Sequence, residues 1–179
     1  FIANTNVSFN LLPWLTLQET IGIDTYTDKR KGETNVGTRG TPNGSMYDQR
    51  INRSEINSDF LVTANRELTE DFTLDILVGN NINVRNYTSE QLFGTGLNVP
   101  GFFHISNANS LTGDEEVTER RLVSVYTHAT LDYQDLIYLT LTARNDWSST
   151  LPEDNNSYFY PSASIGFVFS DVIDPEARG

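Results

Sequence analysis

The chain has 179 residues, of which 37% are hydrophobic and 20% charged, and its formal net charge at pH 7 is −12. The negative charge argues against nucleic-acid binding, because no basic stripe is present to neutralise phosphates. Cysteine is absent, which excludes disulfide bonds, thiolate metal sites and cysteine nucleophiles.

Alternation of apolar and polar residues with a period of two recurs along the chain and predicts about seven β-strands. Most of them are close to the roughly 9–11 residues that a tilted strand needs to cross a bilayer. The first is weak, with only Val7 and Phe9 on its apolar face. The first four predicted strands cover residues 4–10, 15–27, 57–65 and 71–83.

The last three predicted strands cover residues 121–131, 136–147 and 159–170. The middle one is the clearest, with an apolar face made by Ile137, Leu139, Leu141 and Ala143. Its other face is polar and charged, with Tyr138, Thr140, Thr142, Arg144 and Asp146. Trp147 and Phe159 lie at strand ends on the apolar side, where a membrane barrel carries its aromatic girdles.

The links between these strands alternate in length. Short links are expected near residues 12–13, 66–70 and 132–135, and long ones at about 28–50, 84–119 and 148–157. In an up-and-down membrane barrel the periplasmic turns are short and the extracellular loops are long. The sequence therefore predicts an all-β, antiparallel up-and-down transmembrane β-barrel, in which the three long links are extracellular. A soluble β-sandwich with aromatic residues capping its core stays open as an alternative.

An odd number of strands does not close a single-chain bacterial barrel. An open sheet would also leave two unpaired edges, which hydrocarbon does not tolerate. We therefore expect residues 1–179 to be part of a larger barrel, with further strands on both sides in sequence.

The region of the last two strands carries a recognisable pattern. A strand ends in Arg144-x-Asp146-x-Ser148-Ser149, and after a loop the next one begins Tyr160-Pro161-Ser162. This pattern resembles the SusC/RagA family of TonB-dependent outer-membrane transporters. The stretches 121–126 and 131–133 resemble the strand–turn–strand that precedes the motif in that family. The resemblance covers most of the chain and is most specific over about residues 120–170.

The resemblance implies a 22-stranded barrel with an N-terminal plug in the outer membrane of a Gram-negative bacterium. It also implies a SusD-like surface lipoprotein that lids the barrel, and import of glycans or peptides driven by TonB–ExbB–ExbD. These 179 residues carry no plug and no TonB box, so we expect coupling to TonB to lie outside them. A passive outer-membrane barrel or adhesin, and a soluble carbohydrate-binding sandwich, are the competing interpretations.

Arg144 and Asp146 are expected on the lumen face, one pleat apart. They predict either a polar site that contacts substrate or plug, or a structural charge lattice in a wet barrel interior. The structural interpretation is favoured, because barrel interiors are polar whatever they transport.

The link at 84–119 is the main candidate for ligand or lid contact. It places exposed aromatic rings among amides and glycines, which suits sugar stacking or a protein lid as well as it suits packing of the loop itself. The candidate contact residues are Tyr87, Phe93, Phe102, Phe103 and His104.

Enzymatic chemistry and cofactors are not expected. Neither a nucleophile elbow nor a Ser–His–Asp arrangement is recognisable, and the two histidines do not stand at zinc-ligand spacing. Asp114, Glu115 and Glu116 form a weak calcium candidate, which a solvated acidic loop explains better.

Overall fold

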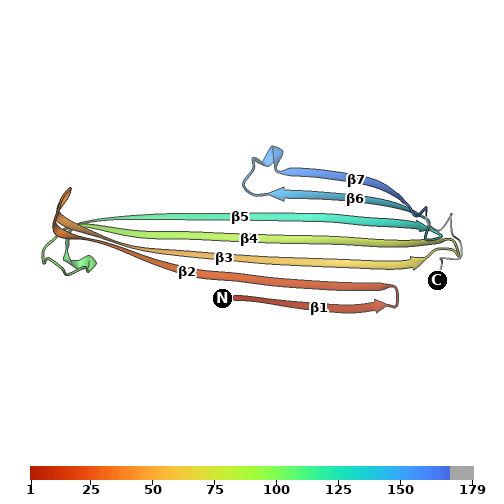
Figure 1. Cartoon of the computed structure of the whole chain (residues 1–179), viewed down its shortest axis with the longest axis horizontal. Coiled ribbons are helices and arrows are strands. Elements are labelled where there is room, and N and C mark those ends of the chain that lie inside the picture. The colour runs from red at the N-terminus through yellow and green to blue at the C-terminus, as the bar shows by residue number, and fades with distance from the viewer. Residues whose placement is uncertain (170–179) are drawn as a thin grey trace. The chain divides into compact units, whose positions relative to one another are not determined.

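The structure is a computed structural model and describes residues 1–169. Seven strands form one sheet in which each strand pairs with its neighbours in sequence (Figure 1). The strands are β1 (Ile2–Leu12), β2 (Leu15–Thr38), β3 (Thr41–Glu67), β4 (Phe72–Leu97), β5 (Ala108–Tyr133), β6 (Ile137–Ser148) and β7 (Ser157–Phe167). Two short 3-10 helices, η1 (Ile105–Asn107) and η2 (Glu153–Asn155), lie between strands.

This arrangement confirms the predicted all-β fold of seven antiparallel up-and-down strands. A β-sandwich requires two sheets packed face to face, whereas the described residues form a single sheet. Within residues 1–169 no helix has the length and apolar character to span a membrane. Ser170, the last residue of the final predicted strand, lies outside the described residues.

Two of the three predicted long loops are wrong. Most of 28–50 belongs to β2 and β3, which are joined by a turn at residues 39–40. Most of 84–119 belongs to β4 and β5, with only residues 98–107 between them. The physical reason is that these strand portions carry polar and charged side chains on both faces, so no apolar alternation marks them as strands. The third predicted loop lies between β6 and β7, as expected.

The chain divides into two compact units, which share β2, β3, β4 and β5. Unit 1 comprises Phe1–Ile2, Ile23–Glu55 and Arg85–Glu119. Unit 2 comprises Ala3–Gly22, Ile56–Val84 and the chain from Arg120 onward.

Unit 2 exposes its large apolar side chains. On β6, Leu139, Leu141 and Trp147 are exposed, and Leu141 is 49% exposed. The residues that alternate with them, including Arg144 and Asp146, are partly covered. Among the described residues of unit 2, the buried ones are small: Gly79, Ser124 and Ser148. One face of this sheet therefore exposes large apolar side chains, while the side chains on the other are polar and partly covered.

Unit 1 has a small apolar core of its own. Met46, Ile51 and Leu97 are 1%, 6% and 7% exposed. Gly94 allows close packing at this core, since a Cβ atom there would lie 2.7 Å from Ala108 Cβ and 3.5 Å from Met46 Cγ. The extended strands of unit 1 therefore pack together around this small core.

Candidate functional site

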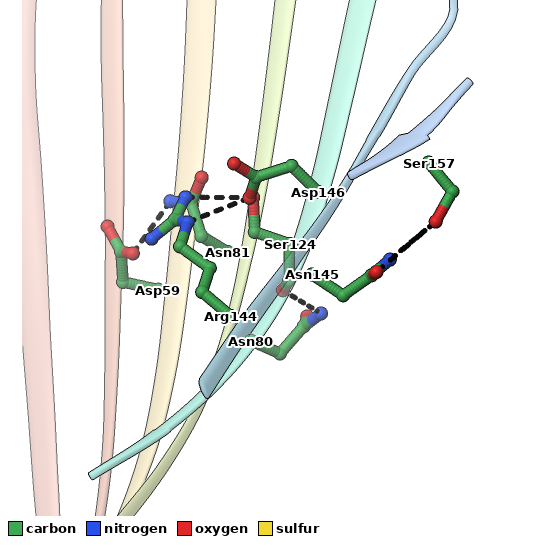
Figure 2. Close-up of polar contacts among 8 residues, drawn as sticks. All are labelled: Asp59, Asn80, Asn81, Ser124, Arg144, Asn145, Asp146 and Ser157. Carbon is green, nitrogen blue, oxygen red and sulfur yellow. Dashed lines mark hydrogen bonds and ion pairs between the residues drawn. The ribbon is translucent and has the colours of Figure 1, made fainter. Parts of the chain in front are cut away.

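The polar face of unit 2 is organised around Arg144 on β6. Its Nε donates to Asp146 Oδ1 at 2.7 Å, and its Nη2 donates to Ser124 Oγ at 2.9 Å (Figure 2). Its guanidinium also lies 5.3 Å from the centre of the Tyr126 ring. The β5–β6 register explains these contacts, because Ser124 pairs with Asp146 and Tyr126 pairs with Arg144. The two motif residues therefore share one face and form an ion pair.

A second polar cluster on this face joins β3 to β4. The Asn81 side-chain amide donates to Asp59 Oδ1 at 2.6 Å and to Asn57 Oδ1 at 3.1 Å. Asn83 donates to the same Asn57 oxygen at 3.3 Å. Among the described residues, no buried side-chain nitrogen or oxygen lacks a hydrogen-bond partner. The polar face thus carries two clusters, each with contacts among its own residues, and a structural role for Arg144 and Asp146 stays a prediction.

The opposite, apolar face carries a few polar groups, each with a partner. Asn80 donates to the backbone oxygen of Ser124 at 2.9 Å, and Asn145 donates to Ser157 Oγ at 2.9 Å (Figure 2). Ser124 is fully buried and is bonded on both faces, through its hydroxyl to Arg144 and through its carbonyl to Asn80. These two polar side chains on the apolar face are therefore satisfied within the sheet.

Tyr87, predicted as a ligand contact, lies on β4 in unit 1 and contacts Arg53 of β3. The Arg53 guanidinium carbon lies 5.0 Å from the centre of the Tyr87 ring and 6.0 Å from that of Tyr26 on β2. Beside this group, Arg85 Nη2 donates to Glu55 Oε1 at 2.9 Å. Arg53 thus stands between two tyrosines contributed by the strands on either side of it.

The other predicted contact residues are distributed over two elements. Phe93 lies on β4 and is exposed, and Phe102, Phe103 and His104 lie in the link between β4 and β5. Phe102 and His104 stack, with ring centres 5.9 Å apart. The Phe103 carbonyl accepts from Lys31 Nζ at 2.7 Å, which ties this link to β2. The structure therefore brings two of the five rings into mutual contact, while Tyr87 contacts Arg53 instead.

Unit 1 also contains an open cleft of about 800 Å³, built by four neighbouring strands. Its cations come from β2 and β3 and include Lys29, Arg30, Lys31 and Arg50. Its acids on β4 and β5 are Glu90, Asp114 and Glu115. The hydrogen bond to Asp28, followed by the charge of Asp28, raises the pKa of Arg30, so this cation stays charged.

The calcium candidate is not supported. Asp114, Glu115 and Glu116 lie on β5, where successive side chains point to opposite faces. Within residues 1–169, no group of three or more His, Cys, Asp or Glu side chains is arranged to hold a metal ion.

Sequence reasoning missed Arg53, Tyr26 and Ser124. Tyr26 lies near the end of the predicted strand 15–27, and Arg53 lies between the expected link 28–50 and the predicted strand 57–65, so the sequence pattern gave no reason to bring them together. Ser124 was placed on the polar face, but its buried position between Arg144 and Asn80 depends on the pairing of three strands.

No family model and no curated protein matches the chain. Three solved structures match almost all of it. The first is the RagAB peptide transporter, with a TM-score of 0.89 and 16% identity over 97% of this chain. The other two are the RagAB peptide importer in its closed-closed state, with a TM-score of 0.85 and 17% identity over 96%, and in its open-open state, with a TM-score of 0.83 and 19% identity over 94%.

The chain spans about a fifth of the length of these neighbours, which it covers by 20%, 20% and 19%. At this level of identity the match shows the fold. It agrees with the SusC/RagA resemblance carried by the Arg144–Asp146 and Tyr160–Ser162 motif. The chain therefore has the fold of a segment of the RagA-type transporter barrel.

Proposed function

We propose that this chain forms part of the wall of a SusC-like, TonB-dependent importer in the outer membrane of a Gram-negative bacterium. The observation that carries the proposal is the match of 97% of the chain to the RagAB peptide transporter at a TM-score of 0.89. The Arg144-x-Asp146-x-Ser148-Ser149 motif supports it from the sequence.

The exposure pattern of unit 2 suits this role. Its outward apolar side chains, such as Leu139 and Leu141, would contact lipid, and its polar cluster around Arg144 would face a wet lumen. Trp147 and Phe159, which are 39% and 64% exposed, would lie at the membrane interfaces as girdle residues. The wall itself makes and breaks no bonds.

The strands of unit 1 suit the extracellular side. They are too polar on both faces to meet hydrocarbon, and their aromatic and charged side chains offer contacts for a SusD-like lipoprotein lid and for the ligand. Energy would come from TonB–ExbB–ExbD through parts of the protein outside these residues. A peptide is the first substrate to test, because the solved neighbours are described as peptide transporters, and an oligosaccharide is the second.

Uptake assays in the source bacterium test the proposal. Cells expressing the protein should accumulate fluorescently labelled peptides or oligosaccharides, and deletion of tonB should abolish that accumulation. Unchanged accumulation without TonB would indicate a passive barrel, and no accumulation of either probe would favour an adhesin. Membrane fractions provide a second check, since the protein should require detergent for extraction and should resist SDS until heated.

A further inference from the structure

We propose that Arg53, held between Tyr26 and Tyr87, is a binding site for a carboxylate group on the ligand. This inference rests on the proposed function, in that it assumes an organic ligand passes this face of unit 1. It goes further by naming the residue and the functional group that it recognises.

The geometry of the site orients the guanidinium. Tyr26 lies on β2 and Tyr87 on β4, so the two rings flank the strand that carries Arg53. Both distances, 6.0 and 5.0 Å to the ring centres, fall within the usual range of about 6 Å for a cation–π contact. Stacking on two rings restricts a long side chain that is otherwise free to adopt many rotamers. Arg53 therefore loses less conformational freedom on binding a ligand than an arginine without such contacts would.

The charge of Arg53 is not balanced by a neighbouring side chain. Among residues 1–169 no ion pair involves Arg53, although its side chain is exposed and therefore reachable. Two acids near Arg53 in the sequence or on β2 have other partners. Glu55 accepts from Arg85 at 2.9 Å, and Asp28 accepts from Arg30 at 2.8 Å.

An exposed guanidinium that two rings orient and that forms no ion pair favours a carboxylate as its ligand. A guanidinium held over aromatic faces still presents its N–H edge, whose planar fork matches a carboxylate with two parallel hydrogen bonds. The flanking tyrosine rings add a surface on which an apolar residue or a sugar ring can lie. Two ligand sources share this chemistry: the carboxyl groups of a peptide and the uronic acid units of an oligosaccharide.

Titration calorimetry on the full-length protein in detergent tests the site with four probes. N-acetyl-trialanine is compared with its C-terminal amide, and trigalacturonic acid with its methyl ester. At least one acid should bind about 10-fold or more tightly than its neutral counterpart, as a charged hydrogen-bond pair predicts. The pair that shows the difference identifies the source of the carboxylate.

Variants then assign the difference to Arg53. Arg53→Gln should abolish the preference for the acid, and Arg53→Lys should retain part of it, because the charge stays while the fork is lost. Arg66→Gln is the matched control, since Arg66 also stacks on a ring, with 5.1 Å from its guanidinium carbon to the centre of Trp14, but lies in unit 2. Heat-modifiable mobility on SDS gels confirms that each variant is folded.

The proposal is overturned if neither acid binds, if acids and neutral probes bind equally, or if the preference survives in Arg53→Gln. Should Arg53→Gln fail to fold, Tyr87→Leu serves in its place and should lower the acid preference several-fold. These outcomes are separate from those of the uptake assay. Binding of the acid with no TonB-dependent uptake would refute the importer and leave the carboxylate site intact.

Discussion

The ring of Tyr126 on β5 lies against Gly79 on β4, so closely that a Cβ atom at Gly79 would lie 2.3 Å from Tyr126 Cζ. The same ring contacts Arg144, whose guanidinium carbon lies 5.3 Å from the ring centre. A glycine on one strand thus positions an aromatic ring from the second, and that ring contacts a cation from the third. This relationship links Gly79 to the polar cluster around Arg144.

Replacing Gly79 by alanine should therefore be costly. The added methyl group forces the Tyr126 ring away from its position and weakens its contact with Arg144. We expect Gly79→Ala to lower the free energy of unfolding by about 1–3 kcal/mol, as overpacking does. Urea unfolding in detergent or lipid, followed by tryptophan fluorescence, measures the change.

Gly22→Ala is the control for this prediction, because no atom lies within 4 Å of a Cβ atom at Gly22. There the alanine should be neutral or stabilising by up to about 1 kcal/mol, since it removes backbone freedom from the unfolded chain. Equal destabilisation by the two variants would show that the Tyr126 ring does not require a glycine beneath it.

The two faces of β6 should respond differently to a charge. Leu141 is exposed on the apolar face, whereas Thr142 lies on the polar face with Arg144. With lipid on the apolar face, Leu141→Arg should cost about 2–4 kcal/mol near the midplane, and Thr142→Arg should cost much less. Unfolding in phospholipid vesicles gives both values, and similar costs would contradict the assignment of lipid to the apolar face.

The Arg144–Asp146 pair should contribute modestly to stability. The two side chains are 42% and 22% exposed, so solvent screens their attraction. A double-mutant cycle with Arg144→Gln and Asp146→Asn should give a coupling energy below about 1 kcal/mol. The arginine variant should be the more damaging, since it also loses the hydrogen bond to Ser124 and the Tyr126 contact. Greater damage from Asp146→Asn would contradict this account.

The turn between β5 and β6 should tolerate glycine at its second position. Gln134 and Asp135 have φ angles of 53° and 58°, and Leu136 N donates to the Tyr133 carbonyl at 3.0 Å. Both residues adopt the left-handed conformation of a type I′ turn, in which glycine is favoured at the second position. We expect Asp135→Gly to raise the free energy of unfolding by up to about 1 kcal/mol.

Chemical denaturation of the same protein tests this turn prediction. Asp132→Ala is the opposing variant, because it removes the oxygen that accepts from Asp135 N at 2.9 Å. It should lower stability. A loss of stability in Asp135→Gly would show that the aspartate side chain matters more than its backbone conformation.

The faces of unit 2 were predictable because one physical rule governs them. Period-two alternation placed Ser124, Tyr126 and His128 opposite the apolar residues of β5, and the register with β6 then follows from a short turn. The order of the seven strands was equally accessible, since short links leave few other topologies. Alternation alone does not predict which residues lie beside one another on strands that are two positions apart in the sheet.

Unit 1 was poorly predictable for the same reason. Its strands carry polar side chains on both faces, so the segments 28–50 and 84–119 read as loops. The Arg53 site needs Tyr26, Arg53 and Tyr87 in one row across three strands. That row exists only when the turn at 39–40, between β2 and β3, and the link at 68–71, between β3 and β4, fix both registers. Two of the three long loops are therefore shorter than predicted, although the up-and-down fold is as predicted.

The outward apolar residues of unit 2 have a consequence for how this protein is made. The hydrophobic effect stabilises a soluble domain by gathering such side chains inside it, and within the described part of unit 2 no large apolar side chain is buried. In the proposed outer-membrane wall, surrounding acyl chains would take the place of such an interior. In water the sheet would have no core to collapse around, so the proposed function implies that the newly secreted chain needs chaperones until lipid encloses it.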